Sequence, residues 1–235
     1  MQPLQTFLDG QVLLIDKSME WTSFDAANKI RSLIKIKKVG HAGTLDPLAT
    51  GLLIICTGKF TKKINEYMGM EKEYTGTITL GATTPTYDLE SDPENFKSTS
   101  QLTEEQIHAA TKQFVGDILQ MPPQHSAIKK NGERLYVSAR KGIAVEMEAR
   151  PVTIRSFSIE KIELPIVHFK VMCSTGTYIR SLANDFGAAL GVGGYMSSLR
   201  RTRIGNFYVE DAKTITEFEE EIKVLRAQLE GEANA

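Results

Sequence analysis

The sequence contains few of the residues that bind metals or form disulfides. Among its 235 residues are two cysteines, four histidines and one tryptophan. Cys56 and Cys173 each lie in an apolar stretch typical of a strand, and neither has a second cysteine nearby. This arrangement excludes a disulfide framework and predicts two buried thiols in a reducing compartment. Because the histidines are scattered, we expect no metal site.

Long hydrophobic runs and targeting signals are also missing. The longest clearly apolar run, 52–56, has five residues, whereas a membrane-spanning helix needs about 20. Residues 1–10 have neither the basic start nor the apolar stretch of a secretory signal. We therefore expect no membrane association and a cytoplasmic location.

Common cofactor motifs are absent as well. There is no G-x-G-x-x-G segment and no P-loop lysine pattern. There are no repeats and no low-complexity segments, and the content of 41% hydrophobic and 24% charged residues is ordinary for a globular chain.

Charge is unevenly distributed along the chain. The net charge is −1, but residues 26–63 contain eight basic residues and one acid, Asp46, for a net charge of +7. Residues 84–106 and 205–235 each carry −5. This segregation suits a polyanion that binds one face only. The alternative interpretation is that the lysines form a solvated helix face.

Periodicity predicts an α+β fold. Ser23 is expected to cap a helix that ends in the basic cluster before Gly40, and Thr103 with Gln106 forms a capping box for a helix reaching about Phe114. Further helices are expected at 178–190 and 215–229. Strand patterns cover 12–15, 52–56, 73–80, 152–164, 166–173, 195–201 and 206–209. No linker separates two halves, so we expect one mixed domain.

Two polar segments are candidates for function. Residues 40–51 (GHAGTLDPLATG) form a loop that contains three glycines and Asp46, the acid in the basic region. A lone aspartate before a proline is more often a turn former than a catalyst. Residues 124–150 form a basic excursion in which basic residues alternate with an aromatic one, a pattern that suits RNA. Its members are Lys129, Lys130, Arg134, Tyr136 and Arg140.

The chain resembles the TruB-type transfer-RNA pseudouridine synthases over nearly its whole length. Residues 40–53 (GHAGTLDPLATGLL) are similar to the family's catalytic motif, 72–81 (KEYTGTITLG) to its tyrosine-bearing motif, and 173–180 (CSTGTYIR) to its third motif. Further segments resemble family segments in the expected order: 122–130, 134–142, 149–151 and 199–201.

The resemblance implies a fold and an activity. The fold is the pseudouridine synthase fold, a single catalytic domain over 1–235 with a central mixed, largely antiparallel β-sheet flanked by helices. No full-size C-terminal RNA-binding domain is expected. The activity is isomerisation of the uridine at position 55 in the T loop, with the tRNA T arm as partner. Neither a cofactor, a metal nor an obligatory protein partner is implied.

The resemblance also implies the roles of individual residues. Asp46 is the catalytic residue, Tyr74 stacks on the target base, and Arg180 pairs with the aspartate. Residues implied to bind the substrate are His41, Tyr178, Leu199, Lys17 and Lys130. The family usually has proline and glycine where this chain has Ser18 and Glu20.

The chemistry of the reaction agrees with these roles. The glycosidic bond at N1 breaks and a bond at C5 forms, without redox change, so the essential group is an ionised carboxylate at the sugar and base. An arginine nearby lowers a carboxylate pKa by about 1 to 3 units. The stacked uridine must be flipped out and held by aromatic or apolar faces, and the tyrosine phenol is a candidate acceptor for the C5 proton.

Three alternatives remain open at this point. One is a guide-RNA-dependent pseudouridine synthase that acts on ribosomal RNA. Another is a non-catalytic RNA-binding or RNA-folding module of the same fold. The third is a glycosidase with a carboxylate pair, although no second acid accompanies Asp46 in its loop.

Overall fold

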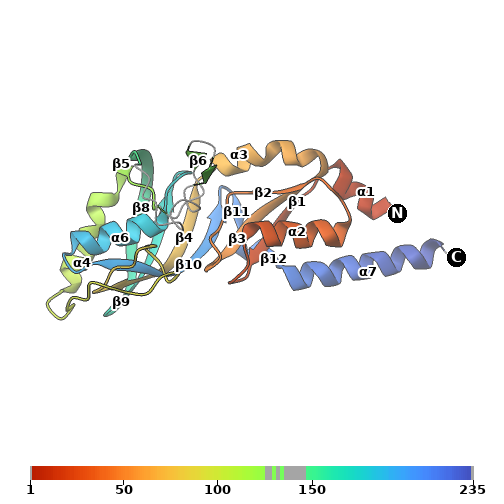
Figure 1. The fold of residues 1–235 in the computed structure, drawn as a ribbon. Coiled ribbons are helices and arrows are strands. Elements are labelled where there is room, and N and C mark those ends of the chain that lie inside the picture. The colour runs from red at the N-terminus through yellow and green to blue at the C-terminus, as the bar shows by residue number, and fades with distance from the viewer. Residues whose placement is uncertain (1, 125–128, 131–132, 135–146, 234–235) are drawn as a thin grey trace. The chain divides into compact units, whose positions relative to one another are not determined.

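Strands and helices fill most of the chain in the computed structural model, which describes residues 2–124, 129–130, 133–134 and 147–233 (Figure 1). The chain divides into two compact units. The first comprises Met1–Lys72 and Arg200–Ala235, and the second comprises Glu73–Leu199. The boundary therefore falls inside strand β10 (Gly194–Ile204), whose last residues belong to the first unit.

The first unit is built around strand β3 (Ala49–Thr57). β1 (Val12–Lys17) runs antiparallel to it on one side, and β2 (Val39–Ala42) runs antiparallel on the other. The end of β10 also neighbours β3, and β11 (Phe207–Tyr208) pairs with it. β12 (Lys213–Thr214) is parallel to β1. Eight of the nine residues of β3 are buried, so this strand is the centre of the unit.

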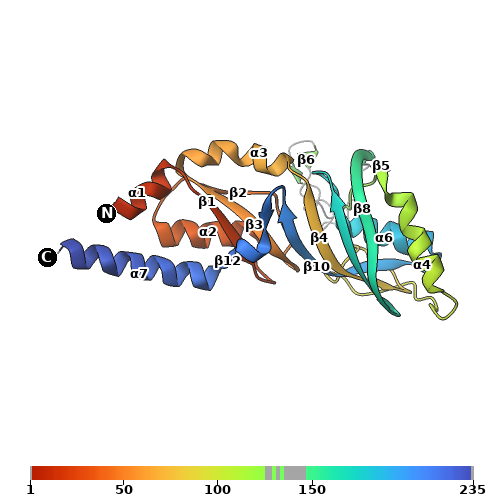
Figure 2. The same cartoon turned by 180° about the vertical axis from the view of Figure 1, so that it is seen from behind.

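Helices cover both faces of β3. Leu53 and Ile55 point into a core shared with α2 (Ser23–Ile34) and α7 (Ile215–Ala233). Leu52 and Ile54 point into the opposite core, which includes Tyr67 of α3 (Ile64–Gly69). α7 lies beside α2 in both views (Figures 1 and 2). The remaining helical segments are α1 (Gln2–Asp9) and the short 3₁₀ turns η1 (Gly58–Lys63) and η3 (Val209–Asp211).

The second unit has the strand order β10, β4 (Lys72–Leu80), β9 (Ile166–Cys173), β8 (Arg150–Glu163) and β5 (Gly116–Gln120). The helical segments among the described residues of this unit are α6 (Ile179–Ala189), α4 (Glu104–Ala110) and the 3₁₀ turn η2 (Thr111–Phe114). β6 (Lys129–Lys130) and β7 (Glu133–Arg134) form a separate short pair. Edge-to-face contacts join Phe157 to Phe114, Phe169 and Phe186, and these rings fill the core between β8, β9 and α6.

The structure confirms the expected α+β class and most expected elements. β1, β4, β8, β9, α6 and α7 lie where the sequence pattern predicts them, and the capping box of Thr103 and Gln106 is present. Cys56 and Cys173 are buried and form no disulfide. The prediction of a single domain over 1–235 stays a prediction.

Four expectations need correction. Thr22, not Ser23, caps α2, because its hydroxyl accepts the Asp25 N–H while the Asp25 carboxylate accepts the Thr22 N–H. β3 begins at Ala49 rather than at residue 52, and His41 lies in strand β2 rather than in a loop. The expected strand at 206–209 contains only the two residues of β11.

The basic excursion at 124–150 lies mostly outside the described residues, including Tyr136 and Arg140. Within the described part of the chain, no helix combines the length and the apolar character that crossing a membrane requires.

Candidate active site

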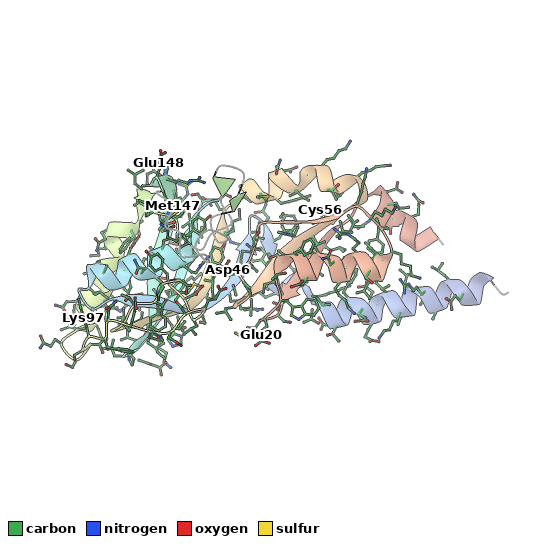
Figure 3. All side chains as sticks on the ribbon, viewed as in Figure 1. Glu20, Asp46, Cys56, Lys97, Met147 and Glu148 are labelled. Atoms are coloured by element: carbon green, nitrogen blue, oxygen red, sulfur yellow. The ribbon has the colours of Figure 1, made fainter. Side chains whose placement is uncertain are left out.

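Asp46 lies on the loop between β2 and β3, and this loop is fixed at several points (Figure 3). The Asp46 carbonyl accepts the N–H of Ala49 at 3.0 Å. On the preceding residue, the N–H of Leu45 donates to Ser23 Oγ at 2.8 Å, and Ser23 Oγ donates to the Leu45 carbonyl. Since Thr22 caps α2, the buried Ser23 side chain holds the loop instead.

The turn after β1 contacts the same loop. Glu20 has a left-handed backbone with φ of +67°, and its N–H donates to the Pro47 carbonyl at 2.8 Å. The family usually has glycine here, which adopts this conformation without strain. Glu20 therefore adopts this turn at a cost in backbone strain, and its side chain is exposed.

Two buried cationic side chains form hydrogen bonds with backbone carbonyls of the Asp46 loop. Lys17 is fully buried, and its Nζ donates to the carbonyls of Trp21 at 2.6 Å and Pro47 at 3.4 Å. Burial lowers the pKa of Lys17 to about 8, an effect that attraction to Asp46 opposes. Arg201, 1% exposed, donates from Nε to the Leu52 carbonyl and from Nη2 to the Gly43 carbonyl. The loop is therefore held at both ends by cation-to-carbonyl hydrogen bonds.

His41 is half-buried in β2, on the strand that leads to the loop. Burial lowers its pKa, and Arg201 lowers it further. Its Nδ1 is buried and has no hydrogen-bond partner among the described residues. Burial and the nearby Arg201 thus both favour the neutral form of the His41 imidazole.

An ion pair that the sequence patterns did not reveal joins β1 to β10 within the first unit. Arg200 donates from Nη1 to Asp16 Oδ1 at 3.0 Å and from Nη2 to Asp16 Oδ2 at 2.7 Å. This two-pronged geometry fixes Asp16 and Arg200, which directly precede the buried Lys17 and Arg201. No local signal could have found the pair, because its members are 184 residues apart.

In the second unit, Tyr74 lies on β4 and Leu199 on β10, and both are buried. The two strands are neighbours, and Thr77 Oγ1 contacts Ser197 Oγ and Ser198 Oγ at 2.8 Å. The structure thus places the two residues expected to hold the base on adjacent strands.

Arg180 is buried in the first turn of α6. Its Nη1 donates to the Thr86 carbonyl at 3.2 Å and lies 3.5 Å from Asp88 Oδ2. Asp88 is 2% exposed, and its Oδ1 accepts the N–H of Glu90. Sequence analysis missed Asp88 because it belongs to an acidic, turn-rich stretch typical of a solvated surface.

Gln120 holds Tyr178, the residue that precedes α6. Its Nε2 donates to the Tyr178 carbonyl at 3.0 Å, and the Tyr178 N–H donates to its Oε1 at 2.8 Å. Ser181 Oγ adds a hydrogen bond to the Met121 carbonyl at 2.7 Å. Tyr178 occupies the cap position of α6, where no side chain of the helix itself provides a cap. Gln120, on β5, holds the backbone of this cap residue from outside the helix.

The expected site residues therefore fall into two sets, one in each unit. Asp46, Lys17 and His41 belong to the first unit, and Tyr74, Tyr178, Arg180 and Leu199 belong to the second. Lys130 lies in β6, and its side chain is outside the described residues. The pairing of Asp46 with Arg180 stays a prediction, as do the roles of the individual residues. Over the described ranges, no group of His, Cys, Asp and Glu is arranged to hold a metal ion.

Comparison with known proteins gives the class as pseudouridylate synthase. The model of the TruB family pseudouridylate synthase N-terminal domain matches residues 31–179. The model of the tRNA pseudouridylate synthase B C-terminal domain matches residues 180–233, which run from α6 to α7. The expectation of no full-size C-terminal RNA-binding domain stays a prediction.

Curated relatives narrow the class to one family. A tRNA pseudouridine synthase B of Flavobacterium johnsoniae is 54% identical, over 93% of this chain and 99% of the relative. One from Chloroherpeton thalassium is 50% identical, over 91% of each chain. The chain belongs to the TruB family.

Solved structures share the fold. In a Cbf5-Nop10-Gar1 complex, the matching chain is 30% identical with a TM-score of 0.73, over 93% of this chain and 56% of that one. In an H/ACA RNP bound to a substrate RNA containing 2'-deoxyuridine, the matching chain is 27% identical with a TM-score of 0.70, over 93% of this chain and 55% of that one. The chain thus spans a little more than half of these solved chains.

Proposed function

We propose that this protein isomerises uridine to pseudouridine at position 55, in the T loop of transfer RNA. The observation that carries the proposal is the complete family motif at 40–53, whose Asp46 is the only acid in a strongly basic region. The relatives named tRNA pseudouridine synthase B match nearly the whole chain, which supports tRNA rather than a guide-RNA-directed target.

In the proposed reaction Asp46 acts as an ionised carboxylate on the flipped nucleotide. The bond between the ribose C1' and the base N1 breaks, the ring turns, and a bond forms between C1' and C5. The proton on C5 then leaves and N1 gains a proton, so the product is an isomer of the uridine. Atoms and electrons balance without an oxidant or a phosphoryl donor.

The other residues position these reacting groups. Tyr74 and Leu199 pack on the base, and Tyr74 accepts the C5 proton. Arg180 pairs with the Asp46 carboxylate and stabilises its charged form. The fixed backbone of the Asp46 loop supports a catalytic role, because a carboxylate held by a rigid scaffold needs little reorganisation during the reaction. The T arm is the part of the tRNA that we propose the protein contacts. The cytoplasmic location stays a prediction.

The test uses unmodified tRNA transcript and the purified protein alone. Pseudouridine is mapped by position, with two controls: a transcript that carries cytidine at position 55, and the Asp46→Asn variant. Product at position 55 with wild type, and none with either control, supports the proposal. Product at other positions, or tight binding without turnover, overturns it, and the second outcome points to an RNA-folding module.

A further inference from the structure

Two consecutive arginines reach the start of β3 from opposite faces of the sheet in the first unit. They are Arg200 and Arg201 of β10, and neighbouring residues of a strand point to opposite faces. Arg200 binds both carboxylate oxygens of Asp16 at 3.0 and 2.7 Å. Arg201 donates from Nε to the Leu52 carbonyl at 2.8 Å and from Nη2 to the Gly43 carbonyl at 3.1 Å. We call these two side chains and their partners the arginine clamp.

The contacts of the arginine clamp lie on both sides of Asp46 along the chain. Gly43 directly follows β2, and Leu52 is the residue of β3 that lies opposite Asp16 in the register with β1. The Leu52 carbonyl also accepts the hydrogen bond from Arg201. The clamp therefore holds the chain before and after the catalytic candidate.

Gly51 shows how closely β10 approaches β3 at this point. Its φ is +100°, and a Cβ atom at this position would lie 2.3 Å from the Arg201 carbonyl oxygen and 2.8 Å from the Arg201 nitrogen. A larger residue would push the two strands apart, because backbone atoms cannot approach a Cβ atom this closely. Glycine at this position of the 40–53 motif therefore admits the backbone that carries Arg201.

Stability alone does not favour a guanidinium at this place. Arg201 is 1% exposed, and its hydrogen-bond partners among the described residues are carbonyls rather than carboxylates. Burying a charge costs free energy unless an opposite charge is paired with it. The planar guanidinium does offer several donors in fixed directions, which suits a role in setting the geometry of the loop.

From these observations we infer that the arginine clamp positions the Asp46 carboxylate for catalysis. Asp16, Arg200 and Arg201 are then positioning residues, which act through the backbone of the loop. The inference rests on the proposed function, in which Asp46 is the catalytic residue. A shift of about 1 Å at a catalytic group can reduce the rate by about 100-fold, so a loosened clamp should slow the reaction without weakening RNA binding.

The first pair of test variants removes one acid each. Asp16→Asn removes the charge that Arg200 binds. Its control, Glu219→Gln, removes an acid of similar exposure, 29% against 24%, from an ion pair with Lys29 in the same unit. Because both changes remove a negative charge, neither removes a direct contact with a phosphate. A lower rate in Asp16→Asn alone therefore does not reflect a lost RNA contact.

The second pair of variants tests the buried arginine. Arg201→Lys keeps the charge but loses the fork that reaches two carbonyls. Its control, Arg226→Lys, changes an arginine of α7 that donates to the Leu33 carbonyl. The melting temperature verifies that each variant is folded. Asp16→Asn changes a partly exposed side chain, so the inference stays testable if Arg201→Lys does not fold.

The single-turnover rate at saturating tRNA and the dissociation constant Kd are measured for every variant. We expect the rate to fall about 10- to 100-fold in Arg201→Lys and about three- to tenfold in Asp16→Asn, with Kd within about twofold of wild type. The double variant of Asp16→Asn with Arg200→Gln should be no slower than the slower single variant, since the two residues act as one pair. Both controls should keep the rate within about twofold of wild type.

Hydrogen exchange separates the clamp from the proposed function. The Ala49 N–H, which donates to the Asp46 carbonyl, should exchange faster in Asp16→Asn and Arg201→Lys than in wild type or in the controls. If wild-type protein forms no pseudouridine in tRNA, the proposed function fails, and this exchange rate alone decides whether the clamp fixes the loop.

Four results would each overturn the inference. They are wild-type rates in both Asp16→Asn and Arg201→Lys, equal losses in the two controls, losses in the Asp16 and Arg200 variants that simply multiply, and unchanged exchange of the Ala49 N–H.

Discussion

Replacement of Gln120 tests whether the start of α6 controls catalysis. The Gln120 amide is 3% exposed and makes both hydrogen bonds to the Tyr178 backbone, two residues before Arg180. Gln120→Leu keeps the apolar part of the side chain and removes both partners. The Tyr178 N–H then loses its hydrogen bond to Gln120, and the Tyr178 carbonyl keeps only the hydrogen bond from the Leu182 N–H among the two described here.

The structure sets the size of the effect. A hydrogen bond contributes about 0.5 to 1.5 kcal/mol to stability, so the loss of two should lower the free energy of unfolding by about 1 to 3 kcal/mol. A shift of about 1 Å at a catalytic group can reduce the rate by about 100-fold. We therefore expect the single-turnover rate at saturating tRNA to fall at least tenfold, while Kd for tRNA changes little.

Gln120→Glu adds a test based on pH. The ionised carboxylate still accepts the Tyr178 N–H but repels the Tyr178 carbonyl, whereas the protonated form donates to it. Burial and this carbonyl raise the pKa of the new carboxyl above its unfolded value of about 4.3. The added stability is therefore fully present below that value and is lost as pH rises through the folded-state pKa. Urea unfolding as a function of pH measures this difference.

The control is Thr111→Val, which removes a hydrogen bond to the His108 carbonyl elsewhere in the same unit. It should lower stability without a matching loss of single-turnover rate. If Gln120→Leu and Thr111→Val lose rate only in proportion to stability, Gln120 has a structural role alone. If Gln120→Glu shows no recovery at acid pH, the two-bond geometry is wrong.

Four further predictions follow from the sites described above. Asp46→Asn should abolish turnover but keep Kd for tRNA within about tenfold, because phosphate contacts dominate affinity; measurable product refutes this. Glu20→Gly should raise the free energy of unfolding by about 0.5 to 1 kcal/mol by relieving left-handed strain, whereas Glu20→Gln should not; a destabilised glycine variant contradicts the strain. Arg180→Lys should slow single turnover strongly, since lysine lacks the planar fork; wild-type rates would place Arg180 outside the site. The pKa of Lys17 in the folded protein, about 8, is below its ordinary value of 10.5, so the free energy of unfolding should increase as the pH rises from about 8 to about 10.5. Lys17→Met should lack this increase when urea unfolding is measured over the same pH range.

Much of the fold could be predicted because its signals are local. The alternating apolar residues of β4 and β9 and the helical spacing of α6 depend on neighbours within a few residues. The choice between Thr22 and Ser23 as the cap of α2 could not be made locally, since both hydroxyls suit a cap. The outcome depends on Leu45, whose backbone N–H and carbonyl form hydrogen bonds with the Ser23 hydroxyl, although the two residues are far apart in sequence.

The candidate site was predictable only in part for the same physical reason. The motif at 40–53 marks Asp46 because its glycines and proline lie close together in sequence. Arg201 and Asp88 depend on partners far away in the chain, Leu52 and Arg180. Their sequence surroundings, a polar strand and an acidic turn region, are those of solvent-exposed residues, so only the folded chain reveals that both are buried.

The two buried cysteines give each unit a built-in reporter of local opening. Cys56 is in the first unit and Cys173 is in the second, and the sequence contains no others. Burial raises the pKa of Cys56 to about 11, so its thiolate, the form that reacts, is scarce while the unit is closed. Alkylation followed by peptide mass spectrometry therefore measures how often each half of the enzyme opens, without any engineered label. The same kinetics, recorded with and without tRNA, distinguish the half that the substrate protects from the half that it leaves unchanged.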